Sequence, residues 1–111
     1  MPIENDVALI PALEDWRLAT LSNGWINVGG VFAPTAYYKD PLGIVHLRGL
    51  VSSGTGIIFT LPVGYRPTGY RLIFPVLALN AIARIDVLLN GSVNFVTGTN
   101  SNVSLDGITF R

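Results

Sequence analysis

The sequence contains no cysteine and a single histidine among its 111 residues. The lack of cysteine excludes disulfides, thiolate zinc sites and a cysteine nucleophile. The single histidine, His46, excludes a metal site built from several histidines. Charged residues are also scarce, since they make up 13% of the chain and sum to a net charge of zero. Without a basic excess, we expect no nucleic-acid partner.

The motifs of common enzymes are missing as well. There is no phosphate-binding loop, no dinucleotide fingerprint and no G-x-S-x-G elbow, and Ser52 lies in a different context. The seven carboxylates are scattered, and only the fold could bring Asp86 and Asp106 together as a catalytic pair. We therefore expect no catalytic residue, no metal and no cofactor.

Long hydrophobic runs are absent. The most apolar stretch, residues 72–83, is interrupted by Pro75 and Asn80 and is too short to span a bilayer, so we expect no membrane insertion. Half of the residues are nevertheless apolar, and the mean hydropathy is +0.49. With so few charges, a monomer would expose many apolar side chains. We infer that part of this surface is buried against further copies of the chain.

Short apolar runs separated by Gly, Pro, Asn and Ser indicate an all-β fold, a sandwich or a barrel of antiparallel strands. We interpret residues 1–24 as a lead-in segment, either the end of a longer protein's shaft or part of the domain, and residues 25–111 as the compact domain. Residues 40–43 fit a type I turn that joins strands at 35–39 and 44–51. In the second of these strands the core face is expected to hold Val45, Leu47, Gly49 and Val51.

Further strands are expected at residues 56–61 and in the runs 70–74 and 76–83, which flank Pro75. Because proline cannot donate to a ladder, Pro75 marks an edge or a bulge. The last apolar run, from Val103 to Phe110, is expected to tie the C-terminal end into a sheet.

The dipeptide Asn90-Gly91 predicts a hairpin between residues 84–89 and 92–97, closed by a two-residue loop. That loop places Leu88 opposite Val93 and Asp86 opposite Phe95. The other face of the hairpin then holds Ile85, Val87, Leu89, Ser92, Asn94 and Val96. Neither face is cleanly polar, which indicates that one lines the core while the other meets a neighbouring subunit.

Four residues are candidates for ligand binding: Trp16, His46, Arg48 and Tyr65. His46 and Arg48 lie two apart on one strand face, where they either hold a sugar hydroxyl or phosphate or form a surface pair, and we favour the surface pair. Trp16 and Trp25 could each stack on a sugar ring, although packing is the ordinary role, above all for Trp25. A similar i, i+2 pair, Arg84 and Asp86, favours a structural ion pair.

Three strings resemble the C-terminal head domains of phage tail fibres and receptor-binding proteins, in particular those of phages of Gram-positive bacteria. Residues 59–67, FTLPVGYRP, resemble their LPxGYRP segment. Residues 38–49, with YKD followed by GIVHLRG, are similar to a hairpin of these heads, and residues 105–110, LDGITF, resemble their last strand. The resemblance runs from about Trp25 to Arg111. In the first string, Tyr65 and Arg66 more readily pack against a partner chain than contact a sugar.

The resemblance implies a β-sandwich of jelly-roll type that forms a homotrimer at the distal tip of a tail fibre in the virion. It implies binding of a host cell-wall saccharide without a reaction, with the rest of the fibre joined through the N-terminus. A structural alternative is a trimerisation cap that has no receptor site of its own. An enzymatic alternative, a depolymerase or esterase accessory fold, would require a carboxylate pair or an activated nucleophile in one cleft.

Overall fold

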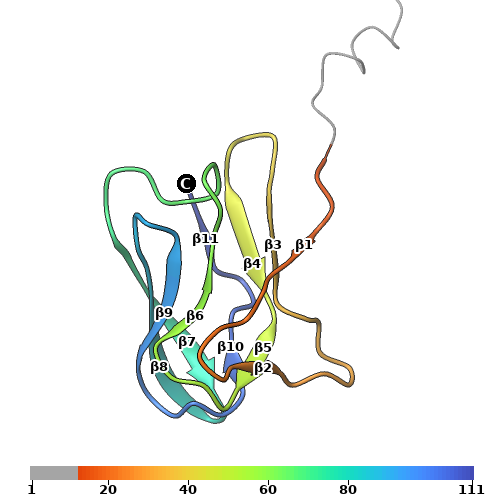
Figure 1. Ribbon diagram of the computed structural model, residues 1–111, viewed down its shortest axis with the longest axis vertical. Helices are drawn as coiled ribbons and strands as arrows, with labels where there is room; N and C mark the ends of the chain where they lie inside the picture. The colour runs from red at the N-terminus through yellow and green to blue at the C-terminus, as the bar shows by residue number, and fades with distance from the viewer. Residues whose placement is uncertain (1–12) are drawn as a thin grey trace, which may run out of the picture.

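Two antiparallel β-sheets face each other and enclose an apolar core (Figure 1). The computed structural model describes residues 13–111, and within that range every regular element is a strand. The expected all-β sandwich is thereby confirmed, while the jelly-roll type and the trimer stay predictions. No helix in residues 13–111 is long and apolar enough to cross a membrane.

The smaller sheet has four strands in the order β1-β3-β4-β11, and the larger has seven in the order β2-β5-β10-β7-β8-β9-β6. All pairs are antiparallel. The strands are β1 (Arg17–Leu18), β2 (Ile26–Asn27), β3 (Ala36–Lys39), β4 (Val45–Arg48), β5 (Leu50–Ser52), β6 (Ile57–Thr60), β7 (Leu72–Ala78), β8 (Ala81–Val87), β9 (Ser92–Thr97), β10 (Val103–Ser104) and β11 (Thr109–Phe110).

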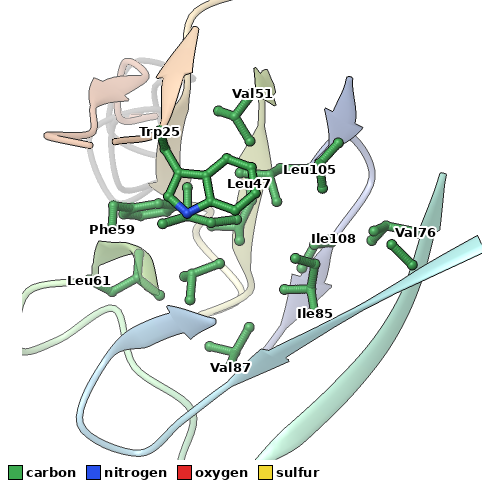
Figure 2. Close-up of a cluster of buried hydrophobic side chains, with 14 of the residues drawn as sticks. Trp25, Leu47, Val51, Phe59, Leu61, Val76, Ile85, Val87, Leu105 and Ile108 are labelled. Carbon is green, nitrogen blue, oxygen red and sulfur yellow. The ribbon is translucent and has the colours of Figure 1, made fainter. Parts of the chain in front are cut away.

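The core lies between the two sheets and is made of alternate residues from most strands (Figure 2). Val45, Leu47 and Val51 are buried as the alternation predicts. Trp25 is also buried, its indole N–H donates to the Thr55 carbonyl at 3.3 Å, and its ring leaves no room for a side chain at Gly54. Its expected packing role is thus confirmed.

The expected strand 44–51 is divided between the two sheets at Gly49. Residues 45–48 pair in the small sheet, whereas residues 50–52 pair in the large one. Gly49 has φ +131°, and its backbone lies so close to Thr35 that a Cβ would collide with it. The prediction of one continuous strand was therefore wrong, although the alternation of buried and partly exposed residues continues through the crossing from Val45 to Val51.

The expected run 76–83 is a hairpin rather than one strand. β7 ends at Ala78, β8 begins at Ala81, and these two residues pair across a turn of Leu79 and Asn80. Leu79 takes φ +52° at the first central position, where hairpin turns of this kind ordinarily carry glycine. Pro75 lies in the part of β7 that pairs with β8 alone, so the predicted edge position is confirmed.

The hairpin at Asn90-Gly91 exists, but its predicted register was wrong by one residue. Val87 lies opposite Val93 and Ile85 opposite Phe95. The Leu88 N–H donates to the Ser92 carbonyl at 2.9 Å, so the loop has three residues and ends on Gly91 at φ +91°. A type I turn followed by a left-handed glycine gives this longer loop. Both apolar pairs then face the core.

Both ends of the described chain are held by strand pairing. β11 pairs with β4, which confirms the expected anchoring of the C-terminal end. β1 pairs with β3, and the Ser22 N–H donates to the Ile58 carbonyl at 2.8 Å. Residues 1–12 of the predicted lead-in segment lie outside the described residues, and its role as the end of a shaft stays a prediction.

Candidate functional site

Four side chains gather on the outer face of the four-stranded sheet: Trp16, Tyr38, His46 and Arg48, which we call the aromatic face. The register of β3 and β4 places Tyr38 opposite His46, on the side away from the core residues Val45 and Leu47. Arg48 follows two residues after His46 and leans the same way. Three of the four predicted site residues are therefore neighbours in the fold.

The rings of the aromatic face contact one another in sequence. The Tyr38 and His46 rings stack with centroids 4.6 Å apart and planes 10° apart. The Trp16 ring meets Tyr38 at 4.6 Å and 73°, an edge contact. The Arg48 guanidinium carbon lies 4.3 Å from the centroid of the Trp16 ring, which is a cation–π contact. These contacts fix the orientation of all four side chains.

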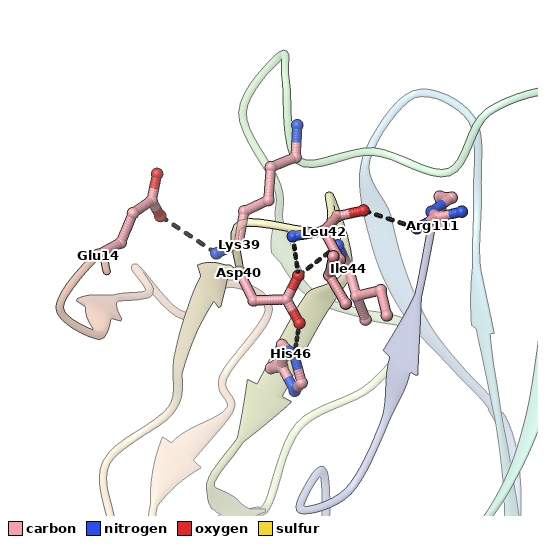
Figure 3. Close-up of polar contacts among 7 residues, drawn as sticks. All are labelled: Glu14, Lys39, Asp40, Leu42, Ile44, His46 and Arg111. Atoms are coloured by element: carbon pink, nitrogen blue, oxygen red, sulfur yellow. Dashed lines mark hydrogen bonds and ion pairs between the residues drawn. The ribbon is translucent and has the colours of Figure 1, made fainter. Parts of the chain in front are cut away.

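Asp40 anchors one end of this face. Its Oδ2 lies 2.8 Å from His46 Nε2, and its Oδ1 accepts hydrogen bonds from the Leu42 and Ile44 N–H groups at 2.9 and 3.0 Å (Figure 3). The hydrogen bond from His46, followed by that from Ile44, lowers the pKa of Asp40. One carboxylate thus holds both the β3–β4 turn and the imidazole ring.

Arg48 has one donor that finds no protein partner. Its Nε is buried without a hydrogen bond. A buried donor left unpaired costs about 1–3 kcal/mol, and the contact with Trp16 offsets part of that cost. The remaining guanidinium N–H groups are the donors that this face can offer to a ligand hydroxyl or phosphate.

Tyr65, the fourth predicted site residue, is not part of the aromatic face. Its hydroxyl donates to Glu14 Oε1 at 2.7 Å, and its ring packs edge-on against Tyr37 at 5.2 Å. The hydrogen bond from Tyr65 lowers the pKa of Glu14, while burial and the Glu14 carboxylate raise the pKa of Tyr65. The other Glu14 oxygen accepts the Lys39 N–H at 3.1 Å (Figure 3). Tyr65 therefore fastens the segment at residue 14 to the sheet.

The remaining acidic candidates are engaged in structural contacts. Asp86 accepts hydrogen bonds from Arg84 and Arg71, so the predicted ion pair with Arg84 is confirmed. Asp106 Oδ1 accepts the Gly49 N–H at 2.8 Å. Among residues 13–111, no group of three His, Asp or Glu side chains could hold a metal ion.

The sequence patterns did not place Tyr38 among the candidate site residues, and they indicated only a turn at Asp40. The turn at residues 40–43 carried a usable signal, because its geometry sets the pairing of Tyr38 with His46. The placement of Trp16 had no such signal, since β1 is only two residues long. The contact of Trp16 with Arg48 depends on the pairing of β1 with β3.

Comparisons with known proteins give one informative result. No protein-family model matches the chain, and no curated protein matches it either. Among solved structures, the crystal structure of the receptor binding protein (gp15) of Listeria phage PSA is similar over 97% of this chain and 70% of that one. The TM-score is 0.74 and the identity is 24%.

The two chains share a fold. At this level of identity the likeness concerns architecture, and it agrees with the family resemblance carried by the three strings. The match with the phage protein extends over nearly the whole chain, so it covers both sheets.

Proposed function

We propose that the chain is the receptor-binding head of a phage tail fibre, located at the distal tip of the fibre in the virion. The observation that carries this proposal is the fold shared with a phage receptor binding protein over 97% of the chain. The head forms a homotrimer, joins the rest of the fibre through its N-terminus and acts without catalysis. The scattered, hydrogen-bonded carboxylates support the last point, since no described pair of them is free in one cleft.

The proposed ligand is a host cell-wall saccharide, bound at the aromatic face. Aromatic rings offer apolar surface to the C–H groups of a sugar ring, and the Arg48 guanidinium and the His46 imidazole offer polar groups beside them. The stacked rings and the Asp40 contact hold these groups in place before a ligand arrives. Such preorganisation lowers the entropic cost of binding. A fibre with three heads further strengthens weak single sites through multivalency.

Adsorption of the labelled full chain to a panel of Gram-positive cell walls tests this proposal. We expect saturable binding to the walls of the host, and loss of that binding after periodate has cleaved the vicinal diols of the wall sugars. Substitution Trp16→Ala or Arg48→Gln should weaken binding at least about fivefold, as truncation of a binding hot spot does. Tyr70→Ala removes an aromatic ring that is 79% exposed elsewhere, and it should leave adsorption unchanged.

The structural alternative, a trimerisation cap without a receptor site, predicts a different result. A folded trimer of the full chain would then bind no wall in the panel. If binding survives periodate, or if Tyr70→Ala weakens it as much as Trp16→Ala, the saccharide site at the aromatic face is wrong. Release of reducing ends from the wall would instead support an enzymatic role.

A further inference from the structure

A basic hollow lies at one end of the sandwich, between the β3–β4 hairpin and the loop that joins β6 to β7. Its volume is about 420 Å³, which is within the usual range of small-molecule sites. Three separate segments supply its cations: Lys39 from β3, Arg66 from the β6–β7 loop and Arg111 from the residue after β11. We call this site the basic hollow. It is distinct from the aromatic face, with which it shares no residue.

The charge of the basic hollow is unbalanced. Three of the seven Lys and Arg residues of the chain line it, and no Asp or Glu side chain of residues 13–111 does. Two carboxylates lie beside Lys39, one on the next residue and one bonded to its N–H, and both are engaged in other contacts. Asp40 bonds to His46 on the outer face, and Glu14 bonds to Tyr65 and to the Lys39 N–H. In a chain with zero net charge, this grouping is a local excess that favours an anion.

Two of the cations are held in position by the backbone. Arg66 Nε donates to the Leu61 carbonyl at 2.9 Å, and Arg111 Nη2 donates to the Leu42 carbonyl at 2.6 Å. A guanidinium has five N–H donors, so each arginine keeps most of its donors for a ligand. Figure 3 shows Arg111 beside Leu42 and the Lys39 side chain extending from the same hairpin. The cations therefore line one hollow from different segments, and two of them are ordered without a ligand.

We propose that the basic hollow binds a phosphate group carried on a small polyol or sugar. Phosphate offers several oxygens in a tetrahedral arrangement, which suits donors arriving from three segments, whereas a carboxylate offers two oxygens in one plane. The hollow is also larger than a phosphate ion alone requires, which leaves room for the organic part next to Gly64 and Thr68. This assignment is independent of saccharide binding at the aromatic face.

Titration of the full chain with sn-glycerol 3-phosphate, followed by amide NMR at low ionic strength, tests the proposal. We expect saturable shifts at Gly43, Gly64 and Thr68, which line the hollow, and a marked weakening of binding at 0.5 M salt. Glycerol, which lacks the charge, should give no shifts. Inorganic phosphate should bind at the same amides if the phosphate group is the determinant. Equal binding of glucuronate would overturn the assignment to phosphate, and shifts confined to other residues would overturn the site.

Charge-removing variants test which cations of the basic hollow contribute to binding. Arg111→Gln and Lys39→Gln should each weaken glycerol 3-phosphate binding about threefold or more, in keeping with partly screened contacts. Arg66→Gln should weaken binding likewise. If loss of the Arg66 hydrogen bond to Leu61 disturbs the β6–β7 loop, the Arg111 and Lys39 variants still test the site. Arg17→Gln is the matched control, because it removes one exposed positive charge that does not line the hollow. A loss as large with Arg17→Gln would show that net charge alone matters and would refute the site.

Discussion

At the scale of single residues, Asp86 is the most tightly constrained charge of the described chain. Its side chain is 0% exposed, although it lies on the outer face of the seven-stranded sheet. Arg84 donates to both of its oxygens at 2.8 and 3.0 Å, and Arg71 Nε donates to Oδ2 at 2.7 Å. These hydrogen bonds, with Arg84 first, lower the pKa of Asp86. A carboxylate surrounded by these donors is stabilised in its ionised form.

We predict that Asp86→Asn destabilises the fold by about 1–3 kcal/mol at pH 7. This is below the value for a fully buried pair because Arg84 and Arg71 remain about half exposed. Since the pKa of the folded state lies below the unfolded value of 3.8, the contribution of Asp86 is complete above pH 3.8. It is then lost as the pH falls through the lower, folded value.

Urea denaturation of the natural chain and of Asp86→Asn at several pH values measures this contribution. Glu14 and Asp40 also have lowered pKa values, so both proteins lose stability in acid. The difference in the free energy of unfolding between the two proteins isolates the contribution of Asp86, and this difference should shrink as the pH falls below 3.8. A difference that stays constant down to pH 2 would mean that the ion pairs contribute nothing to it.

At the scale of elements, the β8–β9 hairpin shows how one residue of loop length decides which side chains are buried. With a two-residue loop, Val96 would share a face with Ile85 and Val87. With the observed three-residue loop, Phe95 joins that face and packs edge-on against Trp25 at 5.3 Å. Val96 lies where the register shifts in β9 and is 39% exposed.

Alanine substitution distinguishes the two registers. Phe95→Ala should destabilise the fold by about 2 kcal/mol or more, because it removes a large ring packed against the core. Val96→Ala should cost about 0.5 kcal/mol or less, as exposed substitutions usually do. Both values come from chemical denaturation. The reverse order, with Val96 costing more than Phe95, would support the two-residue loop.

These elements also show how far the sequence predicts the fold. Alternation and turn dipeptides are local, and they correctly placed the β3–β4 hairpin, the core face at Val45 and Leu47, and the edge at Pro75. These local patterns failed where contacts with a distant segment determine the conformation of a loop. The loop at Gly91 is held partly by the residue after β6, since the Leu61 N–H donates to the Gly91 carbonyl at 2.8 Å. The turn at Leu79 and Asn80 contains no glycine from which it could be predicted.

The candidate site follows the same division between local and distant information. The relation of His46 to Arg48 is a matter of strand alternation and was visible in the sequence. Their meeting with Trp16, and the separation of Tyr65 from all three, depend on the pairing of β1 with β3 and on the Glu14 contact. The β1–β3 pairing and the Glu14 contact each join residues that are far apart in the sequence.

At the scale of the whole molecule, an apolar strip lies on the outer face of the seven-stranded sheet. Ile73 and Leu77 of β7 are 59% and 55% exposed, and Ile82 of β8, which pairs with Leu77, is 72% exposed. The three-residue loop of the β8–β9 hairpin places Phe95 towards the core, yet this strip remains on the outside. Contiguous exposed apolar residues in a chain with few charges favour burial against further copies, as the proposed trimer requires.

We therefore predict a trimer in solution, with a mass by light scattering of three times 11.9 kDa. Ile82→Lys and Leu77→Lys should shift the protein towards the monomer, because a lysine in the middle of a packed interface leaves a buried charge without a partner. Leu42→Lys is the matched control, since Leu42 is also 72% exposed but lies in the β3–β4 turn. It should leave the mass unchanged. Dissociation by Leu42→Lys alone would place the contacts between copies elsewhere. A monomer of the natural chain at micromolar concentration would mean that these contacts do not form, and avidity would then have to come from the rest of the fibre.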